Sequence, residues 1–248
     1  MKKRLWIGTS GYNYSHWRSG VFYPPKLPQS KWLEYYASIF NSVEINATFY
    51  KLATRDAVKG WYKQTPPDFR FVVKGSRFIT HMKRLTDPVP ALRNFFRPLK
   101  PLNDKLSLVL WQFPENLIAN TGRLQAFTKA FRKFSDAPLA FEFRNPTWFV
   151  DQVTEIIQKE RAAFCRADRP EFYESLTIPD TAPFVYFRRH GPLRYAGGYS
   201  EESLQSDAKQ IRAFRRKGRE VYIYFNNDIG GHAPRDAKRL ESIIKGSS

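Results

Sequence analysis

Four side chains that could take or give a proton stand at or near the ends of short, apolar, β-rich runs: Glu44, Glu142, Asp168 and His190. A carboxylate or an imidazole acts as general base or acid when a substrate lies within hydrogen-bond reach. Lys74, Arg144 and Arg188 stand in comparable positions and could hold an anionic group through charge-assisted hydrogen bonds. We therefore predict that the four residues are catalytic and that the three cations bind the ligand.

The alternation of polar and apolar residues along these runs predicts which side chains share a face. In the run 43–48, Glu44, Asn46 and Thr48 alternate with apolar residues, and successive side chains of a strand point to opposite sides of a sheet. The same parity puts further polar residues on one face: Lys74, Gln112, Glu142, Arg144, Tyr186, Arg188, His190, Tyr222, Tyr224 and Asn226. In strand order we expect Glu44 near Lys74, and Asp168 near Arg188. Because buried charges are costly unless paired, an ion-pair network with a purely structural role is the alternative to a ligand site.

Two loops add candidate ligand contacts. One runs from Gly8 to Tyr12 and has Trp17 close behind it, and the other, 226–235, carries two adjacent glycines before a helical segment. In α/β barrels, backbone amides of the late loops often bind phosphate, although ordinary turn chemistry explains such loops equally well. The predicted ligand-binding set is Thr9, Tyr12, Trp17, Asn46, Tyr50, Lys74, Gln112, Arg144, Arg188, Tyr199, Asn226, Asn227 and His232.

The histidines could also act as metal ligands. The chain has four, His16, His81, His190 and His232, and each follows a predicted strand, so together with a carboxylate they could hold a divalent ion. No paired-histidine metal signature occurs, and the single cysteine, Cys165, stands in an apolar run. We predict no metal site and no cofactor.

Eight β-rich runs must position these side chains: 5–9, 42–48, 70–74, 106–112, 139–144, 162–168, 184–190 and 221–227. Apolar residues recur at helical spacing in three segments, 124–134, 148–157 and 204–214, and predict a helix in each. Ser200, shortly before the last of these, is the predicted start of its helix. Strands that alternate with helices indicate a parallel sheet, and eight such units in 248 residues predict a single (β/α)8 TIM-type barrel. We expect one domain over residues 1–248, irregular around strands six and seven, where any helix between Asp168 and Thr181 must be short.

Composition limits the class of protein and suggests partners. The formal net charge of +18 favours polyanions or anionic metabolites as ligands, but a solvated basic surface explains it equally well. No apolar run is long enough to span a membrane, and the basic start 1–4 leads into a predicted strand without a signal-peptide core. We expect a cytoplasmic protein with neither a membrane nor an obligate protein partner.

Several segments together resemble the YecE-like family, a domain-of-unknown-function family of TIM-barrel proteins. They are 7–12, 22–24, 43–50, 71–74, 79–81, 112–114, 141–144, 188–191, 199–200, 224–227 and 231–234. The resemblance covers essentially the whole chain and implies a TIM barrel without an established activity. In outline the barrel is also similar to the endonuclease-IV and xylose-isomerase type, which is an analogy of fold only.

Four functions compete on this evidence. The first is an enzyme, a hydrolase or isomerase, acting on a phosphorylated or otherwise anionic small molecule held by Lys74, Arg144 and Arg188. The second is a nucleic-acid binder or nuclease-like barrel, favoured by the charge and by aromatic residues expected to be exposed, such as Trp17 and Tyr12. The third is a glycoside hydrolase using Glu44 and Glu142. The fourth is a non-catalytic ligand-binding barrel.

Overall fold

The computed structural model describes residues 5–193 and 195–246. By its internal contacts the chain divides into two compact units. The first unit comprises residues 1–44, 166–174 and 183–248, and the second comprises 45–165 and 175–182. The expectation of a single domain stays a prediction, and each unit is described by itself.

The first unit is built on the early and late strands of the chain. Its elements are β1 (Leu5–Thr9), η1 (Ser15–Trp17), η2 (Gln29–Lys31), α1 (Trp32–Ile39), most of β2 (Ser42–Ile45), most of the 3-10 turn η6 (Glu171–Ser175), β7 (Phe184–Arg189), α7 (Glu201–Arg216), β8 (Glu220–Phe225), η7 (Ile229–Gly231) and α8 (His232–Gly246). β1 pairs in parallel with β8, and β8 with β7. A parallel bridge between Ser10 and Glu44 links the end of β1 to β2.

The second unit holds the middle of the chain. Its elements are α2 (Ala47–Tyr50), α3 (Arg55–Lys63), β3 (Arg70–Lys74), the π-helix η3 (Phe78–Met82), α4 (Pro88–Phe96), η4 (Arg97–Lys105), β4 (Leu106–Phe113), α5 (Thr121–Phe131), β5 (Leu139–Phe143), η5 (Pro146–Trp148), α6 (Asp151–Lys159) and most of β6 (Ala163–Ala167). β3 pairs with β4, β4 with β5, and β5 with β6, all in parallel.

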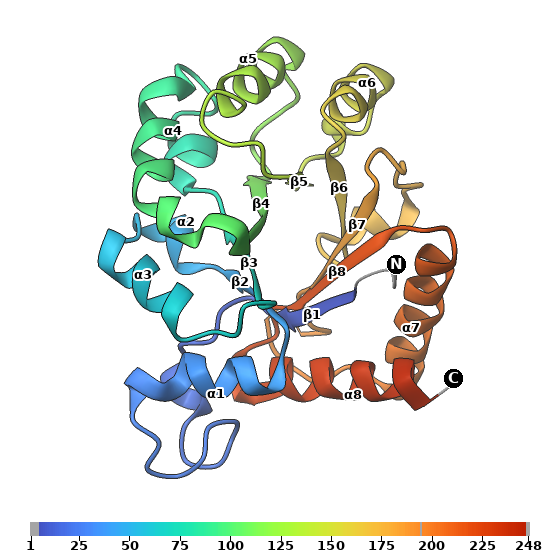
Figure 1. Ribbon diagram of the computed structural model, residues 1–248. Coiled ribbons are helices and arrows are strands. Elements are labelled where there is room, and N and C mark those ends of the chain that lie inside the picture. The colour runs from blue at the N-terminus through green and yellow to red at the C-terminus, as the bar shows by residue number, and fades with distance from the viewer. Residues whose placement is uncertain (1–4, 194, 247–248) are drawn as a thin grey trace. The chain divides into compact units, whose positions relative to one another are not determined.

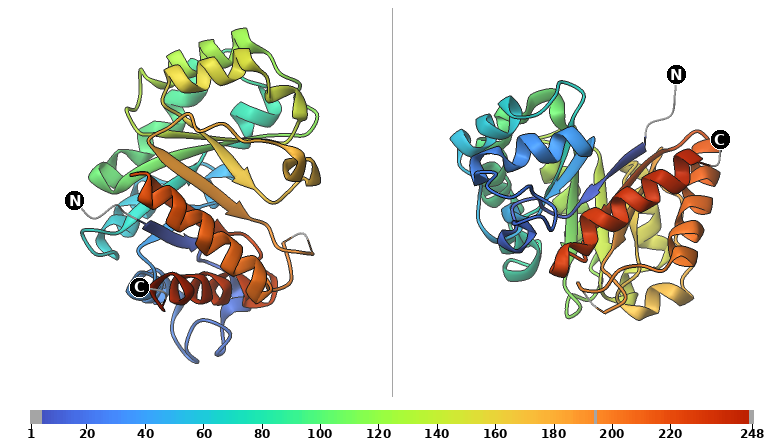
Figure 2. Two further views of the ribbon diagram at one scale, coloured as in Figure 1. Left: turned by 90° about the vertical axis from the view of Figure 1, so that its right-hand side faces the viewer. Right: turned by 90° about the horizontal axis from the view of Figure 1, so that it is seen from below.

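Amphipathic helices cover the strands of each unit. In the first unit α7 packs against α8, and α8 also runs alongside β1 (Figure 1, Figure 2). The side chain of Ser200 accepts a hydrogen bond from the backbone of Ser203 and starts α7, as the sequence predicts. In the second unit Trp111 of β4 packs against Phe127 of α5, so alternate residues of the strand face the helices.

These pairings confirm the predicted fold class, an α/β barrel of the TIM type. From β2 to β8, strands that neighbour in sequence pair with one another in parallel, and the first strand pairs with the last, as in such a barrel; β1 and β2 are joined only by the single bridge Ser10–Glu44, so the barrel is nearly closed. All eight predicted strands form, and the connection after β6 contains only the short turn η6. Among the described residues, no helix combines the length and the apolar character needed to cross a bilayer.

One predicted strand is wrong in its second half. The run 42–48 is extended only to Ile45, and Ala47–Tyr50 forms the single helical turn α2. The hydroxyl of Thr48 donates to the carbonyl of Lys74 at 2.7 Å and lies 3.0 Å from that of Ile45, which fixes this turn against the end of β3. The two-residue alternation therefore stops at Ile45 and does not place Asn46 and Thr48.

Candidate functional site

In the first unit, Glu44 and Arg188 form a fully buried ion pair. Arg188 Nη2 donates to Oε1 of Glu44 at 2.8 Å, and Nε donates to Oε2 at 3.0 Å. This two-point geometry is the strongest arrangement of a guanidinium and a carboxylate. Both side chains are fully buried and face each other, and their predicted roles at a ligand site stay predictions.

Buried tyrosines complete the surroundings of this pair. The hydroxyl of Tyr186 donates to Oε2 of Glu44 at 2.5 Å, and the hydroxyls of Tyr224 and Ser42 lie 2.5 Å apart. Burial raises the pKa of Tyr186, and the neighbouring charge of Glu44 raises it further, so its hydroxyl stays protonated and donates. Both oxygens of Glu44 therefore have donors within the protein. That geometry gives little support to Glu44 as the exposed acid or base of a glycoside hydrolase.

Asp168 and His190 lie together just beyond the ends of β6 and β7. The backbone N–H of His190 donates to Oδ1 of Asp168 at 2.8 Å, and the hydroxyl of Tyr199 donates to Oδ2. The amide nitrogen of Asn226 lies 3.1 Å from Nδ1 of His190. We expected Arg188 near Asp168, but Arg188 pairs with Glu44. The arginine whose charge interacts with Asp168 is Arg189. Four predicted site residues therefore meet in one hydrogen-bonded group.

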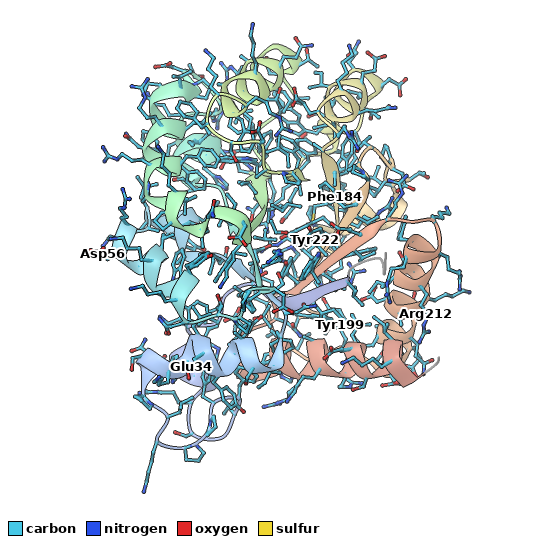
Figure 3. The ribbon with its side chains drawn as sticks, viewed as in Figure 1. Glu34, Asp56, Phe184, Tyr199, Arg212 and Tyr222 are labelled. Atoms are coloured by element: carbon cyan, nitrogen blue, oxygen red, sulfur yellow. The ribbon has the colours of Figure 1, made fainter. Side chains whose placement is uncertain are left out.

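The Asp168 group is tied to helix α8 by a second carboxylate. Asp236 accepts from the backbone N–H of Tyr199 at 3.0 Å and from the side-chain amide of Asn227 at 2.8 Å. Figure 3 labels Tyr199 and also Phe184 and Tyr222; the rings of the latter two pack edge to face, with centroids 5.8 Å apart. His232 lies against this loop, because a Cβ added to Gly198 would come within 3.1 Å of its Nδ1.

The predicted contacts of the first loop have partners inside the first unit. The hydroxyl of Thr9 donates to the carbonyl of Gly11 at 2.6 Å, and the buried indole of Trp17 donates to the carbonyl of Asp228 at 2.9 Å. Tyr12 is half-buried, and its carbonyl accepts from the hydroxyl of Tyr23. The bond from Trp17 holds the loops after β1 and β8 together, and a ligand contact at the three positions stays a prediction.

The second unit carries a pocket at the carboxyl ends of β4 and β5. Its volume is about 440 Å³, and it is lined by His81, Gln112, Pro114, Glu115, Asn116 and Arg144. This is the size of an ordinary small-molecule site. We call it the His81 pocket, and it contains two of the predicted ligand-binding residues, Gln112 and Arg144.

Arg144 is held at the edge of this pocket by Glu142. Nε of Arg144 donates to Oε1 of Glu142 at 2.9 Å; the carboxylate is fully buried, and the arginine side chain is 15% exposed. The predicted pairing of these two residues is confirmed. Because the carboxylate lies behind the guanidinium, Glu142 orients Arg144 toward the pocket more readily than it reaches a substrate.

Three further predicted residues lie in the same unit. Lys74 is buried at the end of β3, with Nζ 4.0 Å from the centre of the Phe49 ring. Tyr50 is 67% exposed, whereas Asn46 is half-buried. Oδ1 of Asn46 is buried and has no hydrogen-bond partner among residues 5–193 and 195–246. An unpaired acceptor at this strand end is consistent with a ligand donor.

His81 is the residue that links this pocket to proton transfer. Its Nδ1 lies 2.8 Å from the hydroxyl of Thr80, and its ring packs edge to face against Phe49. The pKa of His81 is lowered to about 4, first by burial and then by the charges of Lys74, Arg77 and Arg144, which the charge of Glu142 opposes. The imidazole is therefore neutral near pH 7 and stands in a positive field.

Four residues of the pocket are missing from the predicted ligand-binding set: His81, Pro114, Glu115 and Asn116. The signal that could have found Glu115 and Asn116 is local, because they closely follow Gln112, which belongs to that set. The sequence pointed to His81 only as a metal ligand. Within the described chain, no three His, Cys, Asp or Glu side chains gather closely enough to hold a metal ion.

Comparison with known proteins supplies relatives of the whole chain. A family model described as protein of unknown function DUF72 matches residues 6–247. The chain is similar to the UPF0759 protein YunF of Bacillus subtilis, at 26% identity over 97% of this chain and 94% of that protein. It is also similar to YecE of Escherichia coli, at 33% identity over 36% of each chain. The crystal structure of a DUF72 family protein from Thermotoga maritima superposes with a TM-score of 0.84, at 29% identity over 98% of this chain and 99% of that one.

Proposed function

This chain belongs to the family of proteins of unknown function DUF72, and from its own residues we propose that it binds an anionic small molecule in the His81 pocket and acts on it by proton transfer. The observation that carries the proposal is the charge around His81. Three cations and the carboxylate of Glu142 act on its depressed pKa, and Glu115 adds a second carboxylate to the lining, so three positive charges stand against two negative ones at the pocket.

The proposed roles follow from the positions of the side chains. Arg144 binds the anionic group of the ligand, because it lines the pocket and Glu142 fixes its orientation. Gln112, next to it, offers an amide that donates to the same ligand. Lys74 strengthens the positive field from behind the pocket.

His81 is the proposed acid–base group. Thr80 engages Nδ1, so Nε2 is the ring nitrogen left to face a ligand. A neutral imidazole can accept a proton from a substrate or from a water molecule at neutral pH, whereas an imidazolium cannot. Hydrolysis and isomerisation both require such a step.

Calorimetric titration with inorganic phosphate and with a hexose phosphate tests the binding step. Replacing Arg144→Gln should weaken binding roughly 10- to 100-fold, since one charge-assisted contact is lost. Arg55→Gln, an exposed arginine on α3 of the same unit, removes the same charge and should leave the affinity unchanged. Unchanged affinity in Arg144→Gln would reject the anion site.

The catalytic step needs its own variant. His81→Asn should retain the affinity for the anion and lose turnover of whichever phosphorylated substrate the wild-type protein converts. If the variant turns over substrate at the wild-type rate, His81 is not the acid–base group.

Nucleic acid is the second candidate ligand, favoured by the +18 net charge and by the exposed ring of Tyr50, on which a base could stack. This function requires that the protein bind a single-stranded oligonucleotide. The affinity must fall steeply with added salt and must fall again in Tyr50→Ala. Retention of the oligonucleotide by Tyr50→Ala at full affinity would remove this candidate.

A further inference from the structure

A second cavity lies in the second unit, at the amino end of β4. Its volume is about 370 Å³, and Leu106, the first residue of β4, lines it. Gln112 of the His81 pocket stands six residues further along the strand, which corresponds to about 20 Å in an extended chain. The two cavities are therefore separate, and none of the roles proposed above uses this one, which we call the α4 pocket.

Two aromatic side chains, Phe96 and Phe134, line the α4 pocket, and we call them its aromatic wall. The rings of Phe96 and Phe134 are nearly parallel, at 9°, with centroids 6.5 Å apart. Leu99 and Leu106 extend the apolar lining. Such a wall favours a planar or aliphatic ligand body over a small hydrated ion.

Three cations also line the pocket: Arg93, Arg97 and Lys100. Their spacing of four and three residues puts them on one face of the continuous helical segment α4–η4. None of the three side chains makes a hydrogen bond or an ion pair with another described residue, and no lining residue is acidic. Like charges at this spacing repel, so an anion bound among them would relieve the repulsion.

The backbone at the edge of the pocket is strained. Asn103 has a φ of 46° and a ψ of −122°, inside η4 and directly beside the cavity. A residue other than glycine in this region costs free energy, and such residues concentrate where a ligand or a switch requires them. A strained backbone alone does not identify a ligand site, but this one borders a cavity lined by aromatic rings and cations.

We propose that the α4 pocket is a second binding site, for an organic anion with a flat apolar body, such as an aromatic carboxylate, sulfonate or phosphate. The aromatic wall covers the body, and the three cations surround the charged group. Charge complementarity selects this occupant: a neutral apolar ligand would leave the cations unpaired, and a bare inorganic anion would leave the aromatic wall exposed to water.

A matched pair of fluorescent probes tests the proposal on the whole protein. Anilinonaphthalene sulfonate has both a flat apolar body and an anionic group, whereas N-phenylnaphthylamine has the same rings without the sulfonate. The wild-type protein should bind the sulfonate probe at least tenfold more tightly than the neutral one, a difference of about 1.4 kcal/mol.

Two variants locate the site. The combined change Arg93→Gln, Arg97→Gln and Lys100→Gln should reduce the affinity for the sulfonate probe to that for the neutral probe. The control Arg55→Gln, Lys63→Gln and Lys159→Gln removes equal charge from exposed positions of the same unit and should not. Ser135→Trp fills the cavity while keeping all three cations, and should abolish binding of both probes.

Each outcome decides the question, provided that thermal melting shows every variant to be folded. Equal losses in the two triple variants would mean that general charge and not the α4 pocket attracts the probe, and would overturn the proposal. Full binding by the Ser135→Trp variant would overturn it as well. Loss of affinity in Arg144→Gln instead would assign the probe to the His81 pocket and would likewise reject the second site.

Discussion

At the level of single residues, the pair Glu44–Arg188 and the pair Glu142–Arg144 differ in accessibility. The first is fully buried, and every oxygen of its carboxylate is occupied by internal donors. The second borders a cavity. A buried pair contributes little net stability, but removing one partner leaves a charge without compensation. We therefore interpret Glu44–Arg188 as structural and Arg144 as functional.

That interpretation predicts a specific pattern of stabilities. Arg188→Met should lower the free energy of unfolding by about 3–5 kcal/mol, because Glu44 is left charged in an apolar interior. The double variant Glu44→Gln with Arg188→Met should regain part of this loss, because a neutral amide at that position needs no opposite charge and can still accept from the hydroxyl of Tyr186. Urea unfolding measures both.

The exposed pair Lys31–Glu34 in the same unit provides the control, since Lys31→Met should cost less than about 1 kcal/mol. A double variant less stable than Arg188→Met alone would contradict the structural interpretation.

His81 predicts a pH dependence of stability. Its pKa is about 4 in the folded protein, against 6.5 for an unperturbed histidine. Between these values the unfolded chain binds more protons, so stability falls as the pH drops from about 6.5 to about 4. His81→Asn should flatten this part of the curve. Urea unfolding of both proteins between these pH limits measures the difference; because all other groups are shared, parallel curves would contradict the depressed pKa.

The sequence located these residues better than it located their partners. Glu142 and Arg144 are two residues apart on one run, so parity alone predicts their contact. Glu44 and Arg188 are 144 residues apart, and they meet across the interior of the first unit, not between neighbouring strands. Strand order pointed to Lys74 as the neighbour of Glu44 and to Asp168 as the neighbour of Arg188. It carries no information on how far a long side chain reaches.

At the level of elements, apolar runs predicted the strands well, whereas the turns after them were not predictable. The run after β2 remains rich in β-forming residues through Thr48, Phe49 and Tyr50, yet it folds into α2 because Thr48 bonds to the end of β3. The π-helix η3 carries His81, and such single π turns are too rare for a sequence pattern to predict. Sequence patterns thus predicted the scaffold, and the His81 pocket depended on two turns that they could not predict.

Lys105 illustrates how one side chain joins two elements. It is buried at the junction of η4 and β4, and its Nζ donates to the carbonyls of Tyr62 and Thr65, at 2.8 and 2.7 Å. These carbonyls lie at and just beyond the end of α3, where they have no helical partner and where a cation is favourable.

Lys105→Met should therefore cost about 1–3 kcal/mol of unfolding free energy, because both carbonyls lose a charged donor in a buried position. Lys63→Met, at the exposed end of the same helix, should stay within about 0.5 kcal/mol of the wild type. Chemical unfolding distinguishes the two. Equal stabilities would mean that water replaces Lys105 at these carbonyls without loss.

For the whole molecule, the +18 net charge is the feature that composition predicts and that structure only partly explains. Some cations are committed to pairs, such as Arg189 with Asp207, and others gather without acidic partners in the α4 pocket. A molecule this basic repels itself, so added salt should stabilise it by screening. Screening depends on ionic strength and not on which anion is present, whereas a binding site distinguishes one anion from another.

Thermal melting in chloride and in phosphate at equal ionic strength separates the two effects. A specific anion site adds RT ln(1 + [L]/Kd), about 1.4 kcal/mol at ten times Kd, which corresponds to a rise of about 3–6 °C in Tm for a chain of this size. Phosphate also strengthens apolar burial in any protein, so the comparison needs Arg144→Gln, which shares that effect and the screening. The extra rise in phosphate should be larger for the wild type than for this variant. Equal rises would attribute the response to solvent and net charge, and would leave the His81 pocket without its anion.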